Sequence, residues 1–197
     1  MSERPIVPKH GGYRKLVAYQ LAEVVYDGTV VFTGQHLDPR SRTVDQMVQA
    51  ARSGKQNIAE GGRASGHSSK SKFKLIGVAR ASLEELLLDY EDFLRVQGMV
   101  LWDKNHENIR KIRPSPDQSD QTDQSDRTDS RITYALYRRY IEELGPENAA
   151  NTMIVLIHQT NFPLDRLLRR LEQDFLSKGG ITEAMYEARK KRKSEGF

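Results

Sequence analysis

The fold is decided by residues 73–94, which have the sequence FKLIGVARASLEELLLDYEDFL. Apolar residues recur every three or four positions along this stretch, which is the spacing of one face of an α-helix. We predict a long helix that is N-capped by Ser68 or Ser69, runs to about Gln97 and is followed by Gly98. Its expected core stripe is Phe73, Ile76, Ala79, Leu83, Leu87, Tyr90 and Leu94, with Leu75, Leu86 and Phe93 beside it.

Two further helices are predicted before this stretch. The first covers Tyr13 to Gln35 and the second runs from about Ser41 to Glu60. Small residues on the second helix would allow another helix to approach closely, and residues 61–66, GGRASG, are expected to form a turn. The expected apolar faces are Tyr13, Leu16, Tyr19, Tyr26 and Val30 on the first helix, and Val44, Met47, Val48, Ala51 and Ile58 on the second. The small residues are Ala50, Gly54 and Gly61, and the residues that leave a strand open as an alternative in the first helix are Val24, Val25, Val30, Val31 and Phe32.

Helical patterns return near the end of the chain. A short amphipathic helix is predicted from Ile132 to Leu144, and a fourth long helix begins with Pro146 near its first position and reaches Ser177. Pro163 is expected to kink this helix. Its expected core stripe is Ala150, Met153, Ile157, Leu164, Leu168, Leu171 and Phe175. The predicted fold is therefore all-α, an antiparallel up-down four-helix bundle.

This bundle is expected to occupy residues 13–177, after a flexible N-terminus at residues 1–12. It is interrupted at residues 114–131, PSPDQSDQTDQSDRTDSR, which include five aspartates and no apolar residue. Such a segment buries too little surface to offset its ordering entropy, so we predict a disordered acidic insertion. Residues 178–197 are expected to form a basic C-terminal helix or tail.

Composition narrows the function classes. The 197-residue chain has no cysteine, which excludes disulfides and thiolate chemistry, and carries a formal net charge of +4. It lacks a signal-like start and an apolar run long enough to span a membrane, so we expect a cytoplasmic protein without a membrane partner.

Candidate catalytic groups are few. The histidines at positions 10, 36, 67, 106 and 158 do not pair at helical spacing, and a core role for His158 is favoured over a ligand or base. An acidic run on the third helix lacks the Glu-x-x-His pairs of bundle iron sites, so a solvated face is favoured over a metal site. This run is Glu84, Glu85, Asp89, Glu91 and Asp92. We expect no enzymatic activity, catalytic residue, metal or cofactor.

Basic residues are more informative. Nine of them lie between positions 40 and 80, against the acids Asp45 and Glu60, and on the third helix their position opposes the helix dipole. Either neighbouring helices supply compensating charge, or an anion binds at the Gly/Ser-rich turn. Lys55 lies at the rim of an apolar stripe, where it either extends its stem over apolar surface or faces another subunit. The predicted nucleic-acid-binding residues are Arg42, Arg52, Lys55, Arg63, Lys70, Lys72, Lys74 and Arg80, with Arg189, Lys190, Lys191, Arg192 and Lys193 as either a second phosphate-binding element or a solvated tail.

Residues 45–61, DQMVQAARSGKQNIAEG, and 79–86, ARASLEEL, resemble the four helix bundle family of the protein encoded in the large-subunit ribosomal RNA intervening sequence. Residues 11–16, 156–161 and 179–180 are similar to the bacterial branch with a four helix bundle suffix domain. A relative of this family is the accessory variability determinant of diversity-generating retroelements. The resemblance implies a homo-oligomer, specifically a homopentamer, with a basic surface that engages nucleic acid and with no catalytic residues.

These observations lead us to expect a non-enzymatic oligomeric scaffold that binds nucleic acid, RNA more than DNA, through a basic face. Contact is expected mainly with phosphates and not by base stacking, because we expect no aromatic residue among the basic ones on this surface. The alternative is a protein–protein adaptor whose basic face meets an acidic partner such as a polymerase.

The acidic insertion suggests a competitor for the basic face. Deletion of residues 114–131 should therefore tighten RNA binding, because five aspartates no longer compete with phosphates. Fluorescence anisotropy with a labelled structured RNA measures this, and an unchanged affinity would rule the competition out.

Overall fold

The computed structural model describes residues 12–63, 69–112 and 131–178. This part of the chain is helical and contains no β-strand, which confirms the all-α prediction and removes the strand alternative for the first helix. None of these helices combines the length and the apolar character needed to cross a bilayer. In chain order the elements are η1 (Gly12–Lys15), α1 (Val17–His36), α2 (Arg42–Arg63), α3 (Ser69–Val96), α4 (Glu107–Ile112), η3 (Tyr134–Leu136), α6 (Arg138–Glu142) and α7 (Pro146–Lys178).

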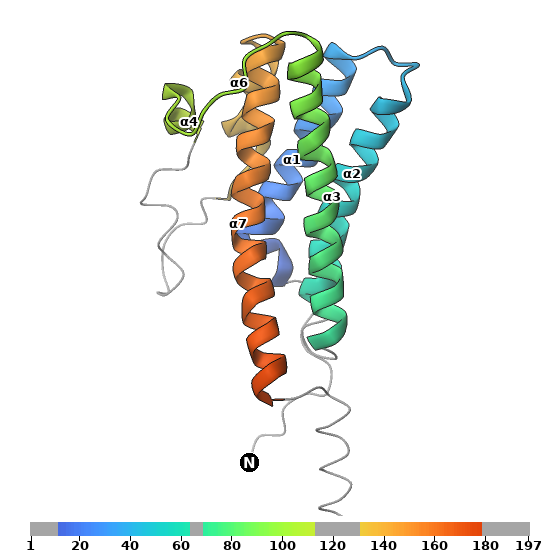
Figure 1. Cartoon of the computed structure of the whole chain (residues 1–197), viewed down its shortest axis with the longest axis vertical. Helices are drawn as coiled ribbons and strands as arrows, with labels where there is room; N and C mark the ends of the chain where they lie inside the picture. Colours follow the sequence, from blue (N-terminus) through green and yellow to red (C-terminus); the bar gives the residue numbers. More distant parts are fainter. Residues whose placement is uncertain (1–11, 64–68, 113–130, 179–197) are drawn as a thin grey trace, which may run out of the picture.

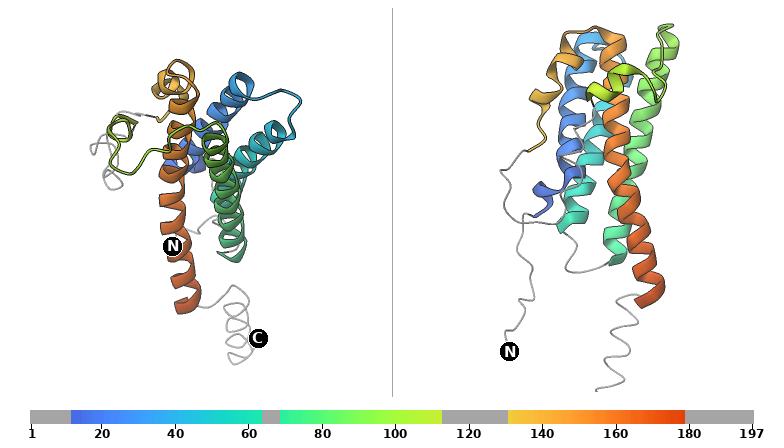
Figure 2. Two further views of the ribbon diagram at one scale, coloured as in Figure 1. Left: turned by 45° about the horizontal axis from the view of Figure 1, so that its top comes forward. Right: turned by 90° about the vertical axis from the view of Figure 1, so that its left-hand side faces the viewer.

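The long helices lie side by side. Helix α1 packs against α2 and α7, and α3 packs against the same two helices. The chain runs upward in α1 and α3 and downward in α2 and α7 in the view of Figure 1. We call the lower end, where α2 ends and α3 begins, the foot, and the opposite end the head. Helix α7 reaches beyond the other helices at the foot (Figures 1 and 2).

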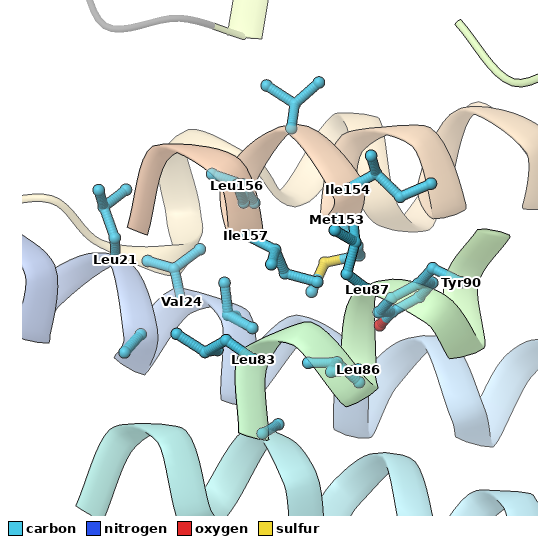
Figure 3. Packing of buried hydrophobic residues seen from close by; sticks show 14 of the residues in the cluster. Leu21, Val24, Leu83, Leu86, Leu87, Tyr90, Met153, Ile154, Leu156 and Ile157 are labelled. Carbon is cyan, nitrogen blue, oxygen red and sulfur yellow. The ribbon is translucent and has the colours of Figure 1, made fainter. Parts of the chain in front are cut away.

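The core lies between α1, α2, α3 and α7. Side chains such as Val24, Leu83 and Ile157 point toward one another from α1, α3 and α7 (Figure 3). Tyr90 is completely buried, and burial raises the pKa of its hydroxyl far above the ordinary range. This hydroxyl donates a hydrogen bond to Thr29 Oγ1 at 3.1 Å, and Thr29 in turn donates to the Val25 carbonyl at 2.8 Å. The hydroxyl groups of Tyr90 and Thr29 are thus satisfied, so their burial costs little.

Two glycines set the distance between α2 and α3. A Cβ atom on Gly54 would lie 2.9 Å from Leu83 Cγ, and one on Gly61 would lie 2.9 Å from Ile76 Cδ1. Both partners belong to α3 and are buried. The small residues on α2 therefore have the role predicted for them, which is to admit a second helix at short distance.

Helix ends follow the predicted capping residues. Gly98 has φ +64° and follows α3, where Met99 N–H donates to the Leu94 carbonyl at 2.9 Å and Gly98 N–H to the Arg95 carbonyl at 3.2 Å. This pair of bonds is a Schellman motif, which satisfies carbonyls at the end of a helix. Pro146 is the first residue of α7, as predicted.

The predicted apolar face of α1 was partly wrong. Leu16 and Val30 are each 43% exposed, and the buried face is formed by Leu21, Val24, Val25 and Phe32 instead. Because α1 is apolar around most of its circumference, spacing alone does not identify its buried side. The tyrosines of the predicted face do pack inward, since Tyr13 is buried and Tyr19 and Tyr26 are half-buried against the core.

Other boundaries also differ. Helix α2 continues to Arg63 instead of ending near Glu60, since Gly61 packs against α3 and Gly62 packs against Tyr13. The predicted helix from Ile132 to Leu144 is two short pieces, η3 and α6. Helix α7 continues through Pro163, and the kink remains a prediction. Residues 61–63 of the predicted turn are helical. The calls for residues 1–11, for 64–66 of that turn, for Ser68 as an N-cap, for 114–130 of the insertion and for 179–197 lie outside the described residues.

Helix α4 was not predicted. It lies beside α7 and buries Ile109 and Ile112. Asn151 of α7 holds the preceding loop, since its Oδ1 accepts from Trp102 N–H and its Nδ2 donates to the Val100 carbonyl, both at 2.8 Å. A helix this short has too few residues for periodicity to detect.

The close approach of α2 and α3 predicts opposite effects at two helical glycines. Gly54→Ala should lower the free energy of unfolding by about 1 kcal/mol, because overlap with Leu83 outweighs the gain in helix propensity. Gly77→Ala, whose Cβ would have no heavy atom within 4 Å, should raise it by about 1 kcal/mol. Urea denaturation measures both, and equal effects would show that Gly54 does not set the helix distance.

Candidate nucleic-acid interface

The foot collects basic residues from three elements, η1, α2 and α3. Arg63 lies in the last turn of α2, and three lysines lie in the first two turns of α3. Element η1, which packs against α2, adds two more cations. We call this set the basic end; it consists of Arg14, Lys15, Arg63, Lys70, Lys72 and Lys74. Within the described part of the chain, no ion pair involves any of its lysines.

Tyr13 organises the arginines of the basic end. Its hydroxyl accepts a hydrogen bond from Arg63 Nη2 at 3.0 Å and a longer one from Arg14 Nε at 3.4 Å. The bond from Arg14, followed by that from Arg63, holds the pKa of the Tyr13 hydroxyl below its ordinary value. Tyr13 itself rests on Gly62, where a Cβ atom would lie 2.6 Å from the tyrosine Cβ. The last turn of α2 thus receives η1 because it lacks a side chain at position 62.

Four of the predicted phosphate-binding residues lie at the foot, namely Arg63, Lys70, Lys72 and Lys74. The other four in the described residues lie elsewhere on α2 and α3; they are Arg42, Arg52, Lys55 and Arg80. Arg42 begins α2, and the helix rise places it about 30 Å from Arg63 along the axis. Arg52 is exposed midway along the same helix. The prediction of a single cluster was therefore wrong for Arg42 and Arg52, because nearness in sequence becomes distance along a helix. The basic run at residues 189–193 lies outside the described residues.

Lys55 is engaged within its own chain. Its Nζ lies 3.8 Å from the centre of the Tyr26 ring of α1, and the lysine is half-buried. This geometry is a cation–π contact. This contact engages the ammonium group within the chain, and the alternative in which Lys55 faces another subunit stays a prediction.

Arg80 joins α3 to α7. Its Nε donates to Asp165 Oδ1 at 3.0 Å, and its Nη1 donates to the Glu84 carboxylate. Two carboxylates therefore pair with the guanidinium within the chain, and its assignment as a phosphate ligand stays a prediction. One explanation for the basic residues of α3 was that a neighbouring helix supplies compensating charge, and Asp165 of α7 does so for Arg80.

Sequence reasoning missed a second group of cations. Arg166, Arg169 and Arg170 are exposed on α7. Because Asp165 lies beside Arg80 and the two helices run in opposite directions, these arginines lie at the level of residues 74–80 of α3. The sequence does contain a sign of this group, because Arg166 and Arg170 are four residues apart and therefore share a helix face. These arginines alternate with the leucines of the predicted core stripe, which dominate the pattern.

Aromatic side chains accompany these cations. Phe73 was predicted to be a core residue, yet it is 45% exposed between Lys72 and Lys74. Phe162 of α7 is 65% exposed, and Arg166 Cζ lies 5.9 Å from the centre of its ring. The expectation of a basic surface without aromatic residues was therefore wrong. Phe175, also placed in the core stripe, is half-exposed because α7 reaches beyond its neighbours.

A polar groove lies between α2 and α3 toward the head, where the two helices diverge (Figure 1). Its volume is about 650 Å³, and a hydrogen bond of 2.9 Å joins the hydroxyls of Ser53 and Ser82 in its wall. It is lined by Arg42, Asp45, Gln46, Gln49, Ala50, Ser53, Ser82, Glu85 and Asp89. Among the residues described, no three acidic or histidine side chains are placed to hold a metal ion.

The predicted solvated acidic face is only partly solvated. Glu85 and Asp92 are exposed, whereas Glu84, Asp89 and Glu91 are half-buried. His158 is exposed on α7, so its predicted place beside the core was wrong.

Comparison with protein-family models, curated proteins and solved structures finds no match to the chain.

Asp89, which lines this groove, is expected to lower the free energy of unfolding at neutral pH. Burial, followed by the charges of Asp92 and Glu85, raises the pKa of the Asp89 carboxyl. A raised pKa in the folded state favours folding at low pH, and this contribution is lost as the pH rises through the folded-state pKa. Asp89→Asn should therefore raise the free energy of unfolding at neutral pH, with a gain that disappears below the unfolded-state pKa of about 3.9. Urea denaturation across this pH range measures the difference.

Asp38→Asn is the matched control. Asp38 is exposed, lies 3.6 Å from Arg40 in an ion pair and does not contribute to the raised pKa of Asp89, so this variant should show no gain at neutral pH. An Asp89→Asn variant no more stable than the wild type at neutral pH would contradict the account.

Proposed function

We propose that this chain is a non-enzymatic scaffold, an up-down four-helix bundle that binds RNA in preference to DNA through its basic end. The observation that carries the proposal is the convergence at the foot of cations from η1, α2 and α3. Phosphate groups bind such clusters without sequence specificity, and the affinity falls steeply with salt.

The lysines are suited to this role by their surroundings. Lys70 and Lys74 are exposed, and the described ion pairs leave both ammonium groups without a carboxylate. Tyr13 orients Arg63 through one hydrogen bond, which leaves its other N–H groups for a phosphate. The oriented guanidinium of Arg63 would supply a fixed phosphate contact, and the long, flexible side chains of the lysines would supply contacts that adapt to the ligand.

The proposed assembly is a homo-oligomer, a homopentamer on the resemblance to the intervening-sequence family. Repetition of the basic end around a symmetry axis would multiply a weak phosphate-binding surface into a strong one. An RNA with several accessible phosphates would then engage several copies of Lys70 and Lys74 together.

A protein–protein adaptor is the second candidate. It is favoured by apolar side chains exposed near the head, where Val96, Val100 and Leu101 follow one another around the end of α3. In this case the basic end would meet an acidic protein such as a polymerase. The two candidates differ in the salt dependence of their affinity for naked RNA.

Reversal of two charges tests the proposal. Lys70→Glu/Lys74→Glu should weaken binding of a labelled structured RNA by more than tenfold at about 50 mM salt, because two phosphate contacts become repulsions. The plot of log affinity against log salt concentration should become shallower, with the magnitude of its slope reduced by about 2, or one unit per lysine. Fluorescence anisotropy between about 50 and 200 mM salt measures both quantities.

A matched control makes the same change of net charge at the head. Arg40→Glu/Arg42→Glu alters exposed residues far from the foot and should leave the affinity within about twofold of wild type. Equal losses in the two variants would mean that net charge, and not the basic end, attracts RNA. The absence of RNA binding by the wild type at low salt would favour the adaptor.

A further inference from the structure

Exposed aromatic rings and cations share the outer surface where α3 meets α7. Phe162 is 65% exposed and Phe73 is 45% exposed. Phe73 precedes Arg80 by two helical turns, and Phe162 precedes Asp165 by less than one turn. Since Arg80 and Asp165 join the two helices, both rings lie close to the line of contact between α3 and α7.

The two rings lie one above the other along this line. Phe73 is displaced from the Arg80–Asp165 pair toward the foot by about 10 Å, and Phe162 is displaced toward the head by about 5 Å. The two residues are therefore about 15 Å apart along the axis.

Cations surround both rings. Arg166 follows Phe162 by four residues and Arg169 by seven, so they share one face of α7, and Arg166 Cζ lies 5.9 Å from the Phe162 ring centre. Lys70 precedes Phe73 by three residues on α3, and Lys74 adjoins it. We call this set the α3–α7 seam; it consists of Lys70, Phe73, Lys74, Phe162, Arg166 and Arg169.

We propose that the α3–α7 seam binds an unpaired stretch of RNA, with bases stacked on Phe162 and Phe73 and phosphates against the cations. Alternation of aromatic rings and cations is how proteins hold single strands, because every base has a face that stacks. A contact between two copies of the chain is less consistent with this surface, since the centres of such interfaces are depleted of charge. The inference rests on the proposed RNA binding and names its substrate as single-stranded.

Removal of one ring tests the inference in the full-length chain. Phe162→Ala should weaken binding of a fluorescein-labelled 12-nucleotide uridine strand by roughly tenfold, the effect of one lost stacking contact. Its affinity for an RNA duplex of the same length should be unchanged, because paired bases cannot stack on the ring. Phe73→Leu should act in the same direction while retaining the apolar volume of a partly buried side chain.

Two control variants separate stacking from other effects. Leu88→Ala removes a side chain that is 55% exposed on α3 but lies toward the head, and it should bind both probes like the wild type. Phe162→Trp should retain affinity for the single strand. Its tryptophan fluorescence should be quenched on binding, beyond any change that Trp102 shows in the wild type.

The failure of this inference is distinct from the failure of the proposed function. Equal affinity of the wild type and Phe162→Ala for the single strand, while Lys70→Glu/Lys74→Glu loses RNA, would overturn the stacking and leave the basic end intact. A change of molecular mass by light scattering in Phe162→Ala would assign the ring to a contact between copies and also overturn it. If the wild type binds neither the single strand nor the duplex at about 50 mM salt, both the stacking and the proposed RNA binding are overturned.

Discussion

The close contact of α2 with α3 is the constraint on which the rest of the structure depends. Gly54 and Gly61 present no side chain, so Leu83 and Ile76 reach the backbone of α2. This contact continues to the last turn of α2, and it brings that turn beside the second turn of α3, where Gly61 meets Ile76. Cations that are separated along the sequence therefore meet at the foot, and a larger residue at either glycine would move the helices that carry them.

Charge on α3 is arranged against its own dipole, and the structure shows part of the compensation. Lysines at the start of a helix raise its energy by a few tenths of a kcal/mol each. Arg80, one turn further into the helix than Ile76, pairs with Asp165 of a neighbouring helix and with Glu84 of its own. Lys70 and Lys74 have no such partner among the described ion pairs. This contrast separates a cation used to join helices from cations left for another molecule.

The sequence predicted the long helices, the small residues of α2 and the glycine after α3, because these features depend on local spacing and backbone preference. It did not predict which side of α1 is buried, since that helix is apolar on most sides. It also assigned Phe73 and Phe175 to the core, because a periodic pattern does not show where a neighbouring helix ends. The partners of Lys55 and Arg80 lie on other helices, so no pattern within α2 or α3 indicated them. As a result, of the predicted basic residues that the structure describes, only Arg63, Lys70, Lys72 and Lys74 lie together at the foot.

The length of α7 beyond its neighbours has a consequence for local opening. From Leu164 onward this helix buries the side chains of Leu164 and Leu171, and Pro163 supplies no N–H to bond the carbonyl of Gln159. The last turns are therefore a unit of low local stability, which opens without disturbing the core. Arg169 and Arg170 belong to this unit. We therefore expect amide hydrogens there to exchange with solvent sooner than those at Met153, and the surface that these arginines form to adapt in shape more readily than the core.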